Sequence, residues 1–218
     1  MSHEPLKARM TFEEYMAFED GAKVRHEFVN GLVIAMNGGT VNHNKLCSNL
    51  SYLLETHTRP SKCVTCNQGM KVFAQQTNSV YYPDVFVACG DYKGKDVIIS
   101  DPSLIIEVLS KSTAAIDRRE KLSAYMQIPS LHEYLIVDQT RRKIDMYRRA
   151  ANGEWLKQTY LGNASVTLLS NSAAGALSLS LDDIYDRVDL PKRNLEVRES
   201  PEEDYLESDW YPEALVFQ

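Results

Sequence analysis

The sequence lacks the features by which membrane-bound, secreted and disulfide-rich proteins are usually identified. None of its apolar stretches reaches the roughly 18 residues that a membrane-spanning helix requires. The segment Met1 to Met10 has neither the apolar core of a signal peptide nor the Ser- and Arg-rich character of a transit peptide. Four cysteines in 218 residues are too few for a disulfide framework. We therefore expect a cytoplasmic protein that has no membrane partner.

The four cysteines are expected to be reduced thiols. Cys63 and Cys66 form a C-x-x-C pattern, but a zinc site would need a second ligand pair, and Cys47 and Cys89 stand alone at distant positions. The segment around Cys63 and Cys66 is predicted to be extended, and residues three apart on a strand point to opposite faces. A zinc or redox site at this C-x-x-C pattern remains the alternative interpretation.

An excess of positive charge is also missing. The net charge is −6, so the chain lacks the basic surface of a protein that coats nucleic acid. Part of the negative charge lies between Glu196 and Glu213, where Arg198 is the one basic residue. Such a run is typical of a solvated tail, and the closing Leu-Val-Phe-Gln resembles the remnant of a protease tag. We therefore expect one domain over residues 1–190 and an acidic tail over 191–218.

Local patterns predict an α/β domain of the α+β kind, in which helices flank a mixed central sheet. Thr11-Phe-Glu-Glu14 has the form of a capping box, and Asn30-Gly31 is a two-residue hairpin turn. Leu104 to Leu109 is almost continuously apolar, which is typical of a strand buried on both faces. The predicted helices span 11–19, 40–58, 113–128 and 181–188, and the predicted extended segments span 24–36, 62–74, 81–89, 104–110, 131–137, 143–149, 154–161 and 166–169.

Two carboxylates stand where a sheet would place them close together. Glu107 interrupts an apolar strand, where a buried charge costs several kcal/mol unless a partner compensates it. Asp84 opens the strand that follows Pro83. If the two strands are neighbours, two hard oxygen ligands meet, and Mg²⁺ is usually held by one or two carboxylates together with water and phosphate. A structural ion pair is the alternative interpretation of Glu107.

Lys121 is the third candidate residue. It lies in the predicted helix after the Glu107 strand, next to the apolar side chains of Leu122 and Tyr125, so its ammonium can reach back toward the sheet. A metal and an ammonium together can bind a phosphodiester and activate water. The alternative is an ion pair with Asp117 one turn earlier, on a solvated face.

These residues belong to blocks that resemble a known family. The blocks are Arg25 to Gly31, His43, Tyr82-Pro-Asp84, Pro102 to Thr113, Asp117 to Tyr125, and Glu133 to Asp138. In this order they resemble the bacterial proteins described as putative restriction endonucleases, within the PD-(D/E)xK nuclease superfamily. The likeness runs from Thr11 to Ile184. Several blocks in one order are more specific than a single Pro-Asp pair.

The resemblance implies a restriction-endonuclease-like core and a nuclease domain. Asp84 and Glu107 would hold Mg²⁺ or Mn²⁺, and Glu27 would be a further acidic group near the metal, although an exposed hairpin residue is an equal alternative for Glu27. The superfamily usually places a lysine two residues after the acidic residue, where this chain has Leu109. The similar family moves that lysine into the next helix, which corresponds to Lys121.

The implied activity is metal-dependent hydrolysis of phosphodiester bonds in DNA. A weak or inactive nuclease fold that binds nucleic acid or oligomerises is the alternative, and a homodimer would fit the cutting of two strands. His43 could act near a phosphate, but a histidine at a helix start is more often a cap or a surface group. The basic clusters at Arg118-Arg119, Arg141 to Lys143 and Arg148-Arg149 could follow a phosphate backbone, or form solvated faces.

Overall fold

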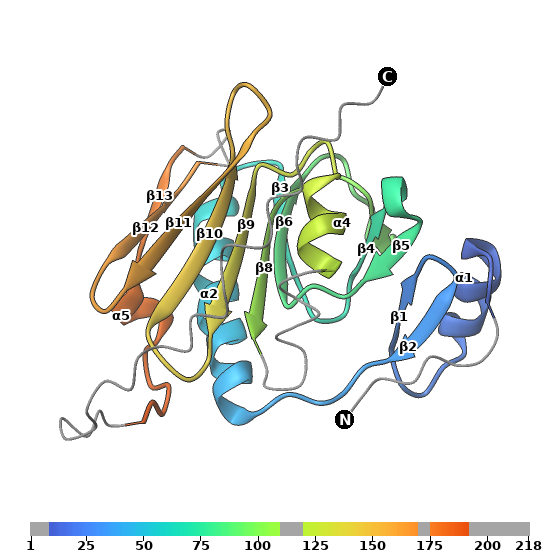
Figure 1. Ribbon diagram of the computed structural model, residues 1–218, viewed down its shortest axis with the longest axis horizontal. Coiled ribbons are helices and arrows are strands. Elements are labelled where there is room, and N and C mark those ends of the chain that lie inside the picture. Colours follow the sequence, from blue (N-terminus) through green and yellow to red (C-terminus); the bar gives the residue numbers. More distant parts are fainter. Residues whose placement is uncertain (1–8, 110–119, 170–174, 192–218) are drawn as a thin grey trace, which may run out of the picture.

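The computed structural model describes residues 9–109, 120–169 and 175–191, and it places two main β-sheets beside each other, together with a third sheet of two strands (Figure 1). The helices are α1 (Phe12–Asp20), α2 (Val41–Thr58), α4 (Leu122–Met126) and α5 (Leu181–Ile184), with a short 3-10 helix at Gln75–Thr77. The strands are β1 (His26–Val29), β2 (Leu32–Ala35), β3 (Cys63–Asn67), β4 (Lys71–Ala74), β5 (Ser79–Tyr81), β6 (Val85–Cys89), β7 (Ile98–Ile99), β8 (Pro102–Leu109), β9 (Glu133–Asp138), β10 (Lys143–Arg149), β11 (Trp155–Leu161), β12 (Ser165–Leu168) and β13 (Leu177–Ser180). No helix in these ranges is long and apolar enough to cross a membrane.

The larger sheet has six strands in the order β11-β10-β9-β8-β6-β3, with β8 and β9 parallel and the other pairs antiparallel. Every residue of β8 is buried, as its apolar sequence predicts. Alternate residues face opposite layers: Leu104 and Ile106 pack in the cluster that includes Leu50 of α2, whereas Ile105 packs in the cluster that includes Tyr125 of α4. The two helices therefore cover opposite faces of the same sheet (Figure 1).

The smaller of the two main sheets has five strands in the order β2-β1-β5-β4-β7, and helix α1 packs against it. The predicted capping box forms, because Glu14 N–H donates to Thr11 Oγ1 while Thr11 N–H donates to Glu14 Oε2. Asn30 and Gly31 both have positive φ, 44° and 91°, which a tight hairpin turn of the I′ kind requires. The rings of Phe28 in β1 and Tyr15 in α1 stack with their centroids 5.0 Å apart. The helix therefore covers this face of the hairpin.

Several predicted boundaries differ from the structure. Each of the predicted extended segments 62–74 and 81–89 contains parts of two strands that belong to different sheets. The chain crosses between the sheets at residues 68–70 and again at residues 82–84. β7 and β13 were not predicted; β7 is only two residues long, and β13 alternates Leu with Ser. α5 ends at Ile184 rather than residue 188, and Arg187 has a left-handed φ of 57°. The predicted helix start at residue 113 and the tail from residue 192 lie outside the described residues.

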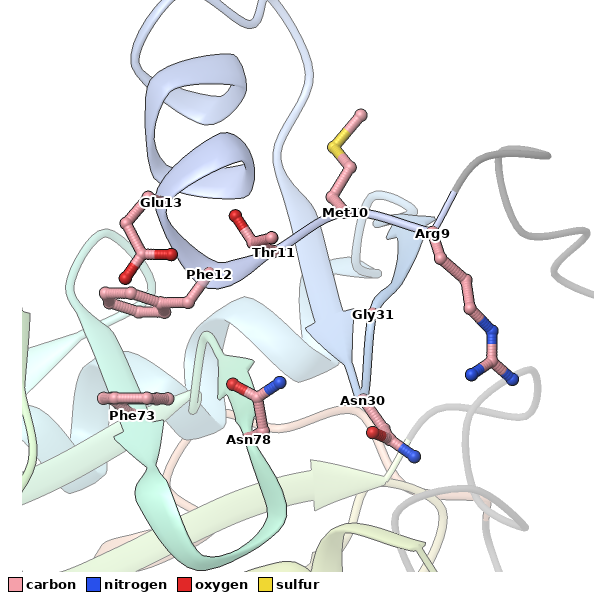
Figure 2. A pocket seen from close by; sticks show the side chains of 9 residues that line it. All are labelled: Arg9, Met10, Thr11, Phe12, Glu13, Asn30, Gly31, Phe73 and Asn78. Atoms are coloured by element: carbon pink, nitrogen blue, oxygen red, sulfur yellow. The ribbon is translucent and has the colours of Figure 1, made fainter.

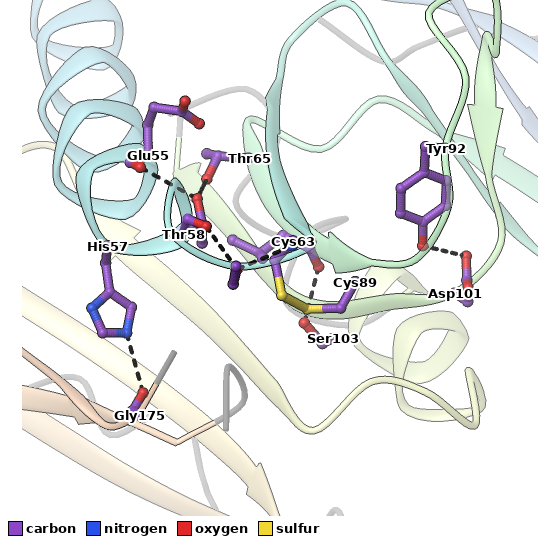
Figure 3. Close-up of a disulfide and its surroundings, with 12 residues drawn as sticks. Glu55, His57, Thr58, Cys63, Thr65, Cys89, Tyr92, Asp101, Ser103 and Gly175 are labelled. Carbon is purple, nitrogen blue, oxygen red and sulfur yellow. Dashed lines mark hydrogen bonds between the residues drawn. A yellow bond between two sulfur atoms is a disulfide. The ribbon is translucent and has the colours of Figure 1, made fainter. Parts of the chain in front are cut away.

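The prediction of four reduced cysteines is wrong for one pair. Cys63 of β3 and Cys89 of β6 stand directly opposite each other in the antiparallel register and form a disulfide (Figure 3). Cys47 and Cys66 are free thiols. As predicted, Cys63 and Cys66 point to opposite faces, because they pack against different core clusters. The strand register that pairs Cys63 with Cys89 is set by packing, which spacing along the chain does not show.

Candidate active site

Asp84 and Glu107 lie next to each other at one end of the β6–β8 pair. The strands are antiparallel neighbours, with Val85 opposite Ile106. The amide of Val108 donates to Asp84 Oδ2 at 2.8 Å, and the amide of Asp84 donates to Glu107 Oε2 at 3.4 Å. The two carboxylates are therefore fixed by each other's strand. Asp84 is partly accessible, whereas Glu107 is only 3% exposed.

Lys121 lies over Glu107, on the sheet side of its helical turn. Its Nζ is 3.3 Å from Glu107 Oε1 and 2.8 Å from Glu27 Oε1, and the residue is only 6% exposed. The ammonium thus compensates the charge that the apolar strand β8 would not otherwise tolerate. Asp117, the alternative partner considered from the sequence, lies outside the described residues.

Glu27 approaches the Lys121 ammonium from the smaller sheet. It lies on β1 between His26 and Phe28, so its side chain points away from the α1 side of the hairpin, and it is 14% exposed rather than free in solvent. Its Oε1 forms an ion pair with the Lys121 ammonium at 2.8 Å. The site is consequently built from both sheets.

Tyr125 is also part of the site, although the sequence pattern indicates only an apolar neighbour of Lys121. Its hydroxyl donates to Glu107 Oε1 at 2.9 Å. Burial, with the charges of Glu107 and Glu27, raises the pKa of Tyr125 well above its ordinary value, so the hydroxyl keeps its proton. The available signal was its position four residues after Lys121, on the same helical face.

His43 also belongs to the site rather than to the helix cap. Thr40 is the cap of α2, and His43 Nε2 lies 3.1 Å from the carboxylate oxygens of Asp84. On its other side, His43 Nδ1 lies 3.6 Å from the thiol sulfur of Cys47. Burial and then the charge of Asp84 raise the pKa of this thiol above its ordinary value. Neither Cys47 nor its contact with His43 was predicted.

The arginine pair of β10 makes its contacts within the protein. Arg148 Nε lies 2.7 Å from Glu133 Oε1, a carboxylate that is 1% exposed. Arg149 donates to three backbone carbonyls, those of Met126, Ile128 and Leu131. Both side chains therefore fasten β10 to its surroundings.

The oxygen donors of Asp84 and Glu107 fit a hard divalent cation. Mg²⁺ needs only one or two protein carboxylates, because water and phosphate complete its six ligands. Asp84 Oδ2 accepts from the Val108 amide, whereas Oδ1 lies 3.1 Å from His43 Nε2, so Oδ1 can bind a cation without breaking a backbone bond. The buried Glu27 Oε1 adds negative charge nearby. These residues thus fit the expected metal.

A hollow of about 680 Å³ lies elsewhere, beside the hairpin turn (Figure 2). Phe12 and Phe73 stack at 4.3 Å within it, and its further lining includes Arg9, Asn30 and Asn78. None of the four predicted site residues lines it. It therefore does not carry the predicted chemistry.

Comparison with known proteins gives relatives over most of the chain. The profile of a family named Uma2 and described as "Putative restriction endonuclease" matches residues 12–182. The uncharacterized protein slr1290 of Synechocystis is 34% identical over 178 residues, which is 81% of this chain and 92% of that protein. A second uncharacterized Synechocystis protein, sll1609, is 34% identical over 161 residues, 72% of this chain and 91% of its own.

A solved structure shares the fold. The crystal structure of a putative nuclease belonging to DUF820, from Anabaena variabilis, superposes with a TM-score of 0.66 at 15% identity, and the match covers 81% of this chain and 97% of that one. This agreement confirms the predicted fold, a mixed sheet with helices against it.

Proposed function

Because the chain belongs to the Uma2 family of putative restriction endonucleases, we propose that it is a divalent-metal-dependent endonuclease that hydrolyses phosphodiester bonds of DNA. One observation carries this proposal: a buried lysine, Lys121, lies within ion-pair distance of Glu107, whose strand also fixes Asp84. Two carboxylates and an ammonium on adjoining elements are the groups that phosphodiester hydrolysis needs.

The metal-binding residues in this proposal are Asp84 and Glu107, and the metal is Mg²⁺ or Mn²⁺. When bound there, the cation supplies Lewis acidity toward the phosphate and lowers the pKa of a water molecule. The protein holds both carboxylates in place beforehand: the Val108 amide orients Asp84, and the Tyr125 hydroxyl orients Glu107. Such prior orientation reduces the cost of reorganisation during the reaction.

Lys121 has the role of binding charge that develops on the phosphate. Its ammonium is buried, so its electrostatic effect is screened less than that of a surface lysine. Glu27 shares the same ammonium and fixes its position from the second sheet. The lysine therefore acts from the helix turn although position 109, where the superfamily pattern expects it, is leucine.

The proposed substrate is DNA, and the proposed assembly for cutting two strands is a homodimer. The chain carries a net charge of −6, so we expect it to contact few phosphates and to lack tight non-specific binding. A two-fold dimer would present one site to each strand of a duplex.

Plasmid cleavage tests the proposal. Supercoiled and single-stranded DNA are incubated with Mg²⁺ or Mn²⁺ and with the wild type, Asp84→Asn, Glu107→Gln or Lys121→Met. The matched control is Asp101→Asn, which changes an exposed carboxylate just before β8 that accepts a hydrogen bond from the Tyr92 hydroxyl at 2.9 Å. We expect the three site variants to lose about 100-fold or more in rate, because each removes a group that stabilises charge during the reaction. The control should cut like the wild type.

The outcomes separate the two candidate functions. Equal cutting by wild type and Asp84→Asn would mean a contaminating nuclease and would refute the assignment. Retention of Mn²⁺ by a wild type that does not cut any DNA would leave the other candidate, a nuclease fold that binds nucleic acid without hydrolysing it. That candidate would then be tested by filter binding at low salt.

A further inference from the structure

A second set of ligand atoms lies beside the carboxylate pair, on the α2 side. One nitrogen of His43, the sulfur of Cys47 and one oxygen of Asp84 all lie within 4.8 Å of one another. His43 Nε2 is 3.1 Å from Asp84, and Cys47 Sγ is 3.6 Å from His43 Nδ1. Among the residues that the structure describes, this is the set of three His, Cys, Asp or Glu side chains that meets such a limit.

The local structure explains why these atoms meet. His43 and Cys47 are four residues apart on α2, so they project from the same face of the helix. The same i, i+4 spacing places the two histidines of H-E-x-x-H helices on one zinc ion. Asp84, the residue just before β6, is the third member of the set, and the amide of Val108 holds its carboxylate in place. Two residues of one helix and the residue that precedes a strand thus provide three ligands for an ion that takes four.

The donor types select a different metal from the one proposed for Asp84 and Glu107. A thiolate and an imidazole suit Zn²⁺, whereas Mg²⁺ takes oxygen ligands. Zinc bonds of about 2.0–2.3 Å place tetrahedral ligands about 3.3–3.8 Å apart, so ligand atoms that already lie within 4.8 Å of one another need to approach by at most about 1.5 Å. The His43 and Asp84 side chains are 12% and 14% exposed, which leaves an entry path.

Gln68 provides an outer partner for these ligands. Its Nε2 lies 3.4 Å from Cys47 Sγ and 3.5 Å from His43 Nδ1, and its backbone amide donates to the carbonyl of Asp84 at 3.2 Å. A hydrogen bond from a neighbouring amide to a ligand atom orients that ligand for the metal. Gln68 therefore helps to hold all three ligand residues in position.

We propose that His43, Cys47 and Asp84 form a Zn²⁺ site that shares Asp84 with the nuclease site, so that bound zinc inhibits cleavage. The inhibitory part of this proposal rests on the proposed nuclease function, whereas the zinc site itself does not. The inhibition follows because Asp84, once bound to Zn²⁺ with Cys47 and His43, no longer serves the Asp84–Glu107 pair. Zinc would thus act as a regulator of the enzyme rather than as its cofactor.

The binding test uses Co²⁺ as a spectroscopic substitute for Zn²⁺. The chelator-treated full chain is titrated with Co²⁺, and a thiolate-to-cobalt charge-transfer band is expected at a stoichiometry of about one per chain, displaced by Zn²⁺. Cys47→Ser should abolish the band, and Asp84→Asn should weaken cobalt binding about tenfold or more. The matched control is Cys66→Ser, which changes the other free thiol and should keep the band.

A second arm measures DNA cleavage with Mg²⁺ against increasing Zn²⁺. Inhibition is expressed relative to each variant's own rate without zinc, and Cys47→Ser should need about tenfold more Zn²⁺ than the wild type or Cys66→Ser. If Cys47→Ser does not fold, Cys47→Ala and His43→Gln replace it in both arms, with circular dichroism as the check.

Each outcome has one meaning. Absence of a thiolate band in the wild type, or a band that persists in Cys47→Ser, overturns the zinc site. A band that depends on Cys47 without any inhibition of cleavage overturns the sharing of Asp84. A band that depends on Cys47 in a protein that never cuts DNA supports the zinc site while refuting the nuclease function.

Discussion

Replacement of Lys121 by methionine removes the cation between Glu27 and Glu107 while it keeps most of the buried stem. The side chains of Lys121, Glu27 and Glu107 are 8%, 14% and 4% exposed, so solvent screens their charges weakly. The variant leaves two carboxylates with uncompensated charge in a largely buried place. Removing one partner of a buried ion pair costs about 3–5 kcal/mol.

We expect the lower end of that range, about 3 kcal/mol, because the Tyr125 hydroxyl still donates to Glu107. For a domain of this size each kcal/mol lowers Tm by roughly 2–4 °C, so the predicted fall is roughly 6–12 °C. The matched control is Lys62→Met. Lys62 lies 4.0 Å from Asp91 with both side chains more than 80% exposed, and such pairs contribute only about 0–1 kcal/mol.

The assay is urea unfolding followed by circular dichroism in the presence of a chelator. Glu27→Gln and the double variant with Lys121→Met complete a double-mutant cycle. Because the double variant no longer carries one of the uncompensated charges, it should be about 1–3 kcal/mol more stable than the sum of the single effects predicts. The reasoning is refuted if Lys121→Met costs no more than Lys62→Met and the cycle is additive. Lys121 would then face solvent, and the site as described would not exist.

Three further perturbations have expected outcomes. Mn²⁺ at 100 times its Kd should stabilise the wild type by about 2.7 kcal/mol in thermal unfolding and Asp84→Asn far less; an equal shift would place the metal elsewhere. Burial raises the pKa of Tyr81 and Tyr125, so their contribution to stability is complete below about pH 10 and is lost as the pH rises further. Tyrosinate absorbance should then appear together with alkaline unfolding, and ordinary titration of these tyrosines in the folded protein would contradict it. Thr11→Ala should cost about 1 kcal/mol in urea, because the α1 cap is lost, whereas Thr77→Ala, outside a helix cap, should cost less.

Features that depend on neighbours in the chain were predictable. The capping box at Thr11, the Asn30-Gly31 turn and the buried strand around Glu107 follow from side-chain chemistry within a few residues. The approach of Lys121 to Glu107 was also predictable, because Lys121 lies only 14 residues after Glu107, next to the apolar residues that pack against the same sheet. A charge in an apolar strand needs a partner, and the next helix supplies one.

Features that depend on packing between distant segments could not be predicted from the sequence. The position of Glu27 stayed open because an exposed hairpin and a hairpin packed against a second sheet have the same sequence pattern. The contact of His43 with Asp84 requires α2 to lie over the end of β6, which periodicity does not reveal. The Cys63–Cys89 disulfide required the register of two strands. The contact of the Tyr125 hydroxyl with Glu107 could not be predicted, because the helical spacing of apolar side chains is the same whether or not the ring carries a hydroxyl.

The division of the site between two sheets has a consequence for how the chain acquires activity. Glu27 arrives on the small sheet, Asp84 and Glu107 on the large one, and Lys121 from the turn before α4, so the four groups spread from residue 27 to residue 121. Contacts between such distant positions require large loops to close and therefore form slowly. A partly folded chain with the larger sheet alone would bring Lys121 to Glu107 without Glu27, and one with the smaller sheet alone would hold only Glu27. The complete group of four side chains would then assemble only at the step of folding at which the two sheets dock.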